Sequence, residues 1–210
     1  MSVRIGDLAP NFTAETTQGR ITFHEWKGKS WAILFSHPRD FTPVCTTELG
    51  TVARLMPEFA RRNTKVIGLS IDPVESHHAW ERDIREVTGT AVNFPMIADP
   101  SRAVATLYDM IHPNASDTST VRSVFIVGPD NKVMLSLTYP ASTGRNFDEV
   151  LRVLDALQLS ARFPVATPAN WQRGQDVIVA LSVSTEEARL TFPKGVTEVK
   201  PYLRTTPQPD

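Results

Sequence analysis

An unbroken apolar run from Trp31 to Phe35 constrains the fold of this chain more than any other stretch. A strand with one face in water alternates apolar and polar residues, whereas a strand covered on both faces does not. Apolar residues then recur at helical spacing at Leu49, Val52, Ala53, Met56 and Ala60. The pattern predicts a central strand that leads into an amphipathic helix.

The same alternation continues along the chain. Strands are expected at 65–72 and 94–99, and helices at 74–87 and 101–108. Strands that alternate with helices are typical of an α/β fold.

Two further strands lie within 123–140, joined by the turn "GPDNK". The second strand, at 133–139, is expected to form an antiparallel edge of the sheet. An amphipathic helix follows at 146–159.

The character of the sequence changes beyond Leu159. The stretch "SARFPVATPANWQRGQ" is interrupted by prolines. It is followed by one apolar run, "DVIVALSV", and we expect a loop-rich tail after that run. We therefore expect a domain boundary near 160–168, with a large domain at 1–160 and a small one at 161–210. A chain of 210 residues is long enough for this division.

Composition narrows the class of protein. Hydrophobic residues make up 41% and charged residues 21%, and the net charge of -1 argues against a nucleic-acid partner. The N-terminus lacks the apolar core of a signal peptide, and no run approaches the ~20 apolar residues that span a bilayer. A cytoplasmic protein without stable membrane association is expected.

Cys45 is the only cysteine in the sequence. An internal disulfide is impossible, which leaves an inert buried thiol, an intermolecular crosslink or a reactive thiol. Cys45 is expected in or near the first helical turn, where the helix dipole favours a thiolate. Thr42 is placed to direct a hydroxyl at the sulfur or at a substrate oxygen, and Pro38 and Pro43 would stiffen the loop.

The stretch "PRDFTPVC" fits the P-x-x-x-T-x-x-C motif of the peroxiredoxins residue for residue. "GDLAPNF" and "YPASTGRNFDEVLRVLDALQL" extend the similarity. The tail "FPKGVTEVKPYLRTTPQP" resembles the C-terminal domain of the 1-Cys, peroxiredoxin-six-like subgroup of the alkyl hydroperoxide reductase/thiol-specific antioxidant superfamily. The resemblance implies a thioredoxin-like α/β fold with a small C-terminal α+β domain.

The resemblance implies that the chain would reduce hydrogen peroxide and organic hydroperoxides to water and alcohols, as an antioxidant peroxidase. Cys45 would be the peroxidatic cysteine and would become a sulfenic acid. Thr42 would orient the peroxide. Arg122 would stabilise the thiolate and the charge that develops across the breaking O–O bond.

The resemblance implies supporting roles for four further residues. Pro38 would shield the pocket, and His37 would contact the peroxide or bound product. Arg145 would be a second cation or a structural partner. Glu48 would pair with an arginine of this cluster, although an exposed carboxylate in the first helical turn is the other interpretation.

A sulfenic acid at Cys45 has no second thiol in its own chain, so the reductant must come from outside. Glutathione, a thioredoxin-like protein and ascorbate are all compatible. The resemblance also implies a homodimer through the strand at 133–139, or a larger oligomer of dimers. We expect no metal, because His24, His77, His78 and His112 show no zinc-binding spacing, and no organic cofactor.

Three alternatives compete with this interpretation. Some relatives have a phospholipase A2 activity attributed to the serine of G-D-S-W-G, which corresponds to Ser30 in "GKSWA" here, with His24 and Asp130 at the partner positions. A non-enzymatic holdase is the second alternative. A disulfide exchanger is the third, and the missing C-x-x-C argues against it.

Overall fold

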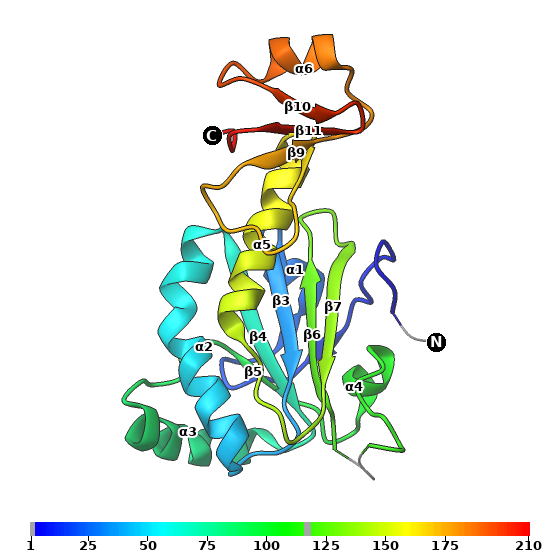
Figure 1. Cartoon of the computed structure of the whole chain (residues 1–210). Coiled ribbons are helices and arrows are strands. Elements are labelled where there is room, and N and C mark those ends of the chain that lie inside the picture. The colour runs from blue at the N-terminus through cyan, green and yellow to red at the C-terminus, as the bar shows by residue number, and fades with distance from the viewer. Residues whose placement is uncertain (1–2, 116–118) are drawn as a thin grey trace. The chain divides into compact units, whose positions relative to one another are not determined.

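The computed structural model describes residues 3–115 and 119–210 of the chain (Figure 1). The chain forms two compact units, Met1–Phe147 and Asp148–Asp210. The expected domain division at residue 160 stays a prediction. Within the described residues, no helix combines the length and the apolar character needed to cross a membrane.

The first unit is built on a five-stranded sheet with the order β5-β4-β3-β6-β7. Its strands are β3 (Trp31–Ser36), β4 (Thr64–Ser70), β5 (Met96–Ala98), β6 (Arg122–Val127) and β7 (Val133–Tyr139). β4 and β5 run parallel to β3, whereas β6 is antiparallel to both β3 and β7. All six residues of β3 are buried, which confirms the predicted central strand. β7 is the last strand of the sheet and pairs antiparallel with β6, which confirms the predicted antiparallel edge.

The topology brings the end of one inner strand and the start of its neighbour together at the same end of the sheet. β3 ends at Ser36, and β6 begins at Arg122. Because the two strands are antiparallel, the end of β3 and the start of β6 lie together. The hydroxyl of Ser36 donates to the carbonyl of Val121 at 2.5 Å, which fixes this junction.

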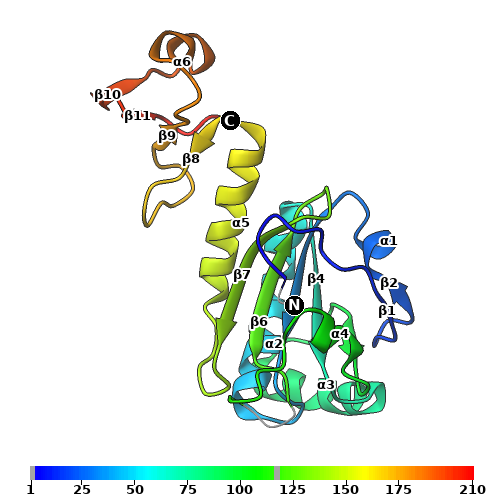
Figure 2. The ribbon, with the colours of Figure 1, turned by 90° about the vertical axis from the view of Figure 1, so that its right-hand side faces the viewer.

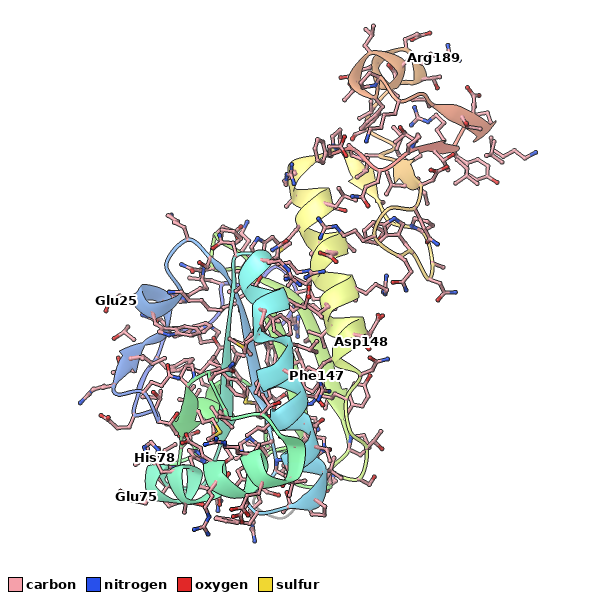
Figure 3. The ribbon with its side chains drawn as sticks, turned by 90° about the vertical axis from the view of Figure 1, so that its left-hand side faces the viewer. Glu25, Glu75, His78, Phe147, Asp148 and Arg189 are labelled. Carbon is pink, nitrogen blue, oxygen red and sulfur yellow. The ribbon has the colours of Figure 1, made fainter. Side chains whose placement is uncertain are left out.

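Helices cover the sheet of the first unit on both faces. They are α1 (Phe23–Lys27), α2 (Pro43–Arg61), α3 (Val74–Thr88) and α4 (Ala103–Leu107). Figures 2 and 3 show α1 and the short pair β1 (Thr13–Ala14) and β2 (Ile21–Thr22) on the face of the sheet opposite to α2. Between α1 and the sheet, Phe12 stacks on Phe23 with ring centroids 5.0 Å apart, within a continuous apolar core.

α5 (Phe147–Arg162) begins at the last residue of the first unit and continues into the second. The second unit has α6 (Thr185–Thr191) and a four-stranded sheet with the order β10-β11-β9-β8. The strands are β8 (Val165–Ala166), β9 (Val177–Val179), β10 (Thr197–Lys200) and β11 (Leu203–Thr206). The expected loop-rich tail beyond the apolar run 176–183 is wrong, because the chain forms α6, β10 and β11 there. These elements of four to seven residues are too short to show a clear period in the sequence.

Candidate active site

Cys45 is the third residue of α2, and its side chain is fully buried. Pro43 starts the helix, where its lack of an N–H has no cost. The first helical turn contains no acidic residue, so nothing in that turn opposes the positive end of the helix dipole. The predicted position of the cysteine in the first turn is confirmed.

Arg122 lies directly against the sulfur. Its Nη1 is 3.3 Å from Cys45 Sγ, although the two residues are 77 positions apart in the sequence. Its Nε and Nη2 both donate to the carbonyl of Ala141, at 3.0 and 2.7 Å. The guanidinium is thus held in one orientation by the backbone beyond β7.

Glu48 lies between two buried arginines. Its Oε2 accepts hydrogen bonds from Arg122 Nη1 at 2.6 Å and from Arg145 Nη2 at 2.7 Å. Its Oε1 accepts from the Nε and the backbone N–H of Arg145, at 2.9 and 2.8 Å. Of the two interpretations of Glu48, the structure shows the ion pair, and the expectation of an exposed carboxylate is wrong.

The surroundings of Glu48 favour its charged form. Burial alone would raise the pKa of this carboxyl group, but the hydrogen bonds and charge of Arg145, together with the charge of Arg122, outweigh it and lower the pKa. The two arginines and the glutamate carry a net charge of one positive. A thiolate at Cys45 would therefore complete a neutral group of four buried charges.

Arg145 also has contacts that the sequence could not specify. Its Nη1 donates to the carbonyl of Ser123 at 2.8 Å. Its guanidinium carbon lies 5.1 Å from the ring centroid of Phe35 and 5.5 Å from that of Phe147. These cation–π contacts fix the second arginine against the sheet.

Pro38 and Thr42 lie in the loop between β3 and α2, which precedes Cys45. Pro38 is buried, as its expected shielding position requires. Thr42 is the residue before the helix, and its hydroxyl donates to the carbonyl of Arg39 at 2.8 Å rather than to the sulfur. The oxygen of this hydroxyl keeps its acceptor capacity.

His37 is buried and belongs to a second polar cluster. Its Nε2 lies 2.9 Å from Asp40 Oδ1, and His77 Nδ1 lies 2.7 Å from Asp40 Oδ2. Asp40 and His77 were not expected from the sequence to have a role. His77, Trp80 and Ile84 are the buried residues of α3 and recur at helical spacing, a signal that could have identified His77 as buried.

The same three residues bring potential metal ligands together. One ligand atom each from His37, Asp40 and His77 lies within 4.8 Å of the others. These atoms already serve as hydrogen-bond partners of one another, at 2.7 and 2.9 Å. We therefore interpret the group as a hydrogen-bonded network and assign no metal to it.

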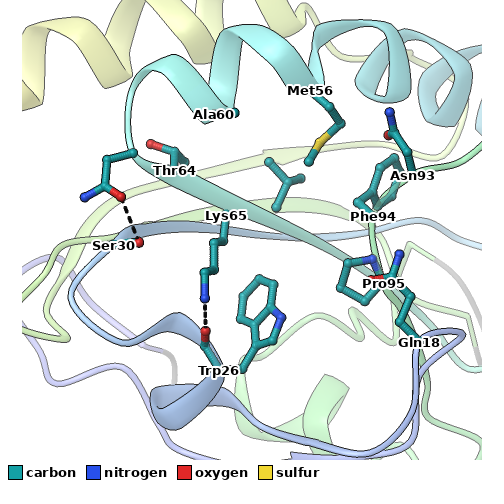
Figure 4. Close-up of a pocket in the computed structure, with 12 residues that line it drawn as sticks. Gln18, Trp26, Ser30, Met56, Ala60, Thr64, Lys65, Asn93, Phe94 and Pro95 are labelled. Atoms are coloured by element: carbon teal, nitrogen blue, oxygen red, sulfur yellow. Dashed lines mark hydrogen bonds between the residues drawn. The ribbon is translucent and has the colours of Figure 1, made fainter.

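Ser30 lies in a surface pocket of about 350 Å³ (Figure 4). Its hydroxyl donates to Asn63 Oδ1 at 2.9 Å, whereas His24 Nε2 bonds the carbonyl of Ala9 at 2.8 Å. Asp130 accepts from the backbone N–H of Lys132 at 3.1 Å. No hydrogen bond joins Ser30, His24 and Asp130 in the part of the chain that the structure describes. The geometry therefore does not assemble a serine nucleophile with a base.

Two family models match the sequence. Residues 5–136 match the AhpC/TSA family, and residues 156–195 match the C-terminal domain of 1-Cys peroxiredoxin. The first match includes both Cys45 and Arg122.

Curated relatives and solved structures agree over the whole chain. The sequence is 56% identical to peroxiredoxin-6 of Mus musculus, covering 98% of this chain and 97% of that one. It is 50% identical to the 1-Cys peroxiredoxin of Dictyostelium discoideum, covering 99% of this chain and 86% of that one.

Among solved structures, a cysteine-to-serine variant of peroxiredoxin 6 from Arenicola marina is similar, with a TM-score of 0.93 and 47% identity over 100% of both chains. A yeast mitochondrial 1-Cys peroxiredoxin has a TM-score of 0.90 and 50% identity, covering 98% of this chain and 99% of that one. The chain therefore belongs to the AhpC/TSA family, as a member of the 1-Cys peroxiredoxins, which are thiol peroxidases.

Proposed function

We propose that Cys45 reduces hydrogen peroxide and organic hydroperoxides. Its thiolate attacks the terminal oxygen, an S–O bond forms, and the O–O bond breaks. The leaving alkoxide or hydroxide takes up a proton and becomes an alcohol or water, and the cysteine becomes a sulfenic acid. The observation that carries the proposal is the 3.3 Å contact between Arg122 Nη1 and the buried sulfur.

The surrounding residues have complementary roles in this reaction. Arg122 stabilises the thiolate and the charge that develops on the departing oxygen. Glu48 and Arg145 hold Arg122 in place through the shared carboxylate. Thr42 orients the peroxide through its hydroxyl oxygen, Pro38 shields the pocket from water, and His37 contacts the peroxide.

The first test is the pre-steady-state reaction with hydrogen peroxide, followed by stopped flow and by mass spectrometry of Cys45. The wild type should gain one oxygen atom at Cys45 far faster than free cysteine reacts, and Cys45→Ser should not react. Arg122→Ala should be slower by about 100-fold or more, as when one charge-stabilising donor is removed from an active site.

Arg54→Ala is the matched control, because Arg54 is an exposed arginine on the same helix as Cys45. It should react like the wild type. A wild type that is no faster than free cysteine would contradict the proposal.

The reductant must come from outside the chain, because Cys45 is the only cysteine in the sequence. A structural study of the yeast mitochondrial 1-Cys peroxiredoxin describes thiol resolution through glutathione and thioredoxin systems. We propose that glutathione or a thioredoxin-like protein reduces the sulfenic acid here. A thiol of either kind would form a mixed disulfide with Cys45 before release.

The expected assembly and cellular setting belong to the same proposal. β7 is an edge strand of its sheet and can pair with β7 of a second copy, which supports a homodimer or an oligomer of dimers. The net charge of -1 supports a function without nucleic acid. We propose antioxidant defence in the cytoplasm, without stable membrane association.

A further inference from the structure

His37, Asp40 and His77 form a buried group of their own. It is separate from the arginine cluster beside Cys45, which consists of Arg122, Glu48 and Arg145. The side chains of His37, Asp40 and His77 have between 0% and 1% of their surface exposed. His37 directly follows β3, Asp40 lies in the loop to α2, and His77 is on α3. One carboxylate bridges the two imidazole rings, because its two oxygens bond different histidines.

The partners of His77 determine its protonation. Its Nε2 lies 3.1 Å from the carbonyl oxygen of Ile97, which can only accept, so Nε2 carries a hydrogen. Its Nδ1 faces the carboxylate of Asp40, which also accepts. Burial alone would raise the pKa of Asp40, but hydrogen bonds from His37 and His77 outweigh it and hold this pKa well below its usual range.

His77 is therefore an imidazolium, with a hydrogen on each nitrogen. Burial on its own would lower the pKa of His77, whereas the hydrogen bond and charge of Asp40 reverse this effect and raise the pKa overall. The pair His77 and Asp40 is thus a buried ion pair.

His37 has the opposite character. Burial, above all, lowers its pKa, and the charges of His77 and Arg145 act in the same direction against the attraction of Asp40. His37 is therefore neutral, and its single ring hydrogen must be on Nε2, which donates to Asp40. Its Nδ1 is buried and has no hydrogen-bond partner among the residues that the structure describes.

The other groups around His37, Asp40 and His77 support a charged His77 and a neutral His37. Asp72 accepts from the backbone N–H of Asp40 at 2.9 Å, and its charge favours the proton on His77. The ring of Trp80 lies 5.4 Å from that of His37 and covers it. Arg145, the cation that disfavours a proton on His37, is also bonded to Glu48 in the cluster around Cys45.

We propose that Asp40 and His77 are positioning residues for peroxide reduction. They hold His37 as the neutral tautomer with its hydrogen on Nε2, so that Nδ1 accepts a hydrogen bond from the O–H group of the hydroperoxide. A buried acceptor without a donor is unfavourable, and the substrate supplies the donor. The proposal rests on the proposed function of Cys45.

Loss of His77 should change the protonation of His37. The positive charge that repels a proton from His37 is removed, and the negative charge of Asp40 is no longer neutralised. His37 then takes up a proton at a higher pH than in the wild type, and its Nδ1 becomes a donor that cannot accept from the peroxide.

The test measures the rate of Cys45 oxidation by hydrogen peroxide between pH 5.5 and 9 in wild type and His77→Leu. Because His37 is more easily protonated in His77→Leu, this variant should be about tenfold slower than wild type near pH 6, and within about twofold near pH 9. A merely structural role of His77 would lower the rate equally at every pH, and that result would overturn the proposal.

His78→Leu is the matched control, because His78 is the exposed neighbour of His77 on α3 (Figure 3). It should follow the wild-type profile at every pH. In the double variant His37→Asn with His77→Leu, the ratio of the rates at pH 6 and pH 9 should return to the wild-type value. An acidic decline that persists in this double variant would not belong to His37 and would contradict the proposal.

Nuclear magnetic resonance of ¹⁵N-labelled histidine in the reduced wild type avoids any folding defect of a variant. At about pH 8 the spectrum should show His77 with both nitrogens protonated and His37 with a bare Nδ1. A neutral His77, or a hydrogen on Nδ1 of His37, would overturn the assignment.

The two proposals fail in different ways. A wild type whose Cys45 does not react overturns the proposed function together with this inference. A reactive wild type whose pH profile is parallel to that of His77→Leu overturns this inference alone.

Discussion

Glu48 connects the charges around Cys45 at the scale of single residues. Replacement by Gln keeps the shape of the side chain but leaves two buried guanidinium groups without their shared carboxylate. We expect Glu48→Gln to lower the free energy of unfolding at pH 7 by about 3–5 kcal/mol, because an uncompensated buried charge is costly. Urea denaturation followed by circular dichroism measures this difference.

The pH dependence of the same difference tests its electrostatic origin. The pKa of Glu48 is lower in the folded protein than its ordinary value of 4.5. The stabilisation is therefore fully present above about pH 5 and is lost as the pH falls through 4.5 toward the folded pKa. Wild type and Glu48→Gln should converge in stability over this acidic range, whereas a difference independent of pH would indicate a packing defect.

Sequence could identify some residues of the site more easily than others. Cys45, Thr42 and Pro38 occupy one short motif, and a lone cysteine after a buried strand directs attention to it. Asp40 lies within the same motif and was still missed, because its function depends on His77, 37 positions away. A contact between distant residues requires the topology, which a local pattern does not contain.

At the scale of elements, Lys27 joins the end of α1 to the turn between β6 and β7. Its side chain is buried, and Nζ donates to the carbonyls of Gly28, Ser30 and Gly128 at 3.0–3.1 Å and to that of Pro129 at 3.4 Å. One ammonium group thus satisfies carbonyls from two loops that are about 100 residues apart in the sequence.

We expect Lys27→Met to lower the free energy of unfolding by about 2–4 kcal/mol, because Met fills the volume but leaves the carbonyls without a donor. Lys29→Met removes an exposed charge two residues away and should change stability by less than about 0.5 kcal/mol. Thermal and urea denaturation of both variants measure the contrast. Equal effects would mean that Lys27 contributes only through net charge.

Elements differed in how well their sequences predicted them. β7 occupies 133–139 as expected, and α3 extends the predicted helix by one residue to Thr88. α4 occupies only Ala103–Leu107 within the predicted 101–108. Arg102 adopts a left-handed conformation at φ 60, so the helix cannot begin before Ala103. Long elements with a clear period can be predicted from the sequence, whereas the bounds of short elements depend on the backbone geometry at their ends.

For the molecule as a whole, the topology of the sheet creates the site. The antiparallel pairing of β3 and β6 brings Arg122 to the end of the sheet at which the loop from β3 to α2 begins. The hairpin pattern predicted that two antiparallel strands would follow one another, but it did not contain the order β3-β6-β7. Only the resemblance to the peroxiredoxins connected Arg122 with Cys45 before the structure did.

Burial of Cys45 also governs the second half of the catalytic cycle. Its side chain is fully buried in the first turn of α2, within the arginine cluster. We expect a small peroxide to reach such a sulfur more readily than a larger thiol, which would require the first turn and its loop to open. Reduction of the sulfenic acid should therefore become independent of reductant concentration when opening limits the rate.

Stopped-flow reduction of the preformed sulfenic acid measures this limit. With glutathione and with a thioredoxin-like protein, the observed rate should rise with concentration and reach the same plateau, because opening of the same protein segment sets it. Oxidation by hydrogen peroxide is the internal control and should stay proportional to peroxide concentration over the same range. Plateaus that differ between the two reductants, or rates that rise linearly without limit, would show that the thiols reach Cys45 without a shared opening step.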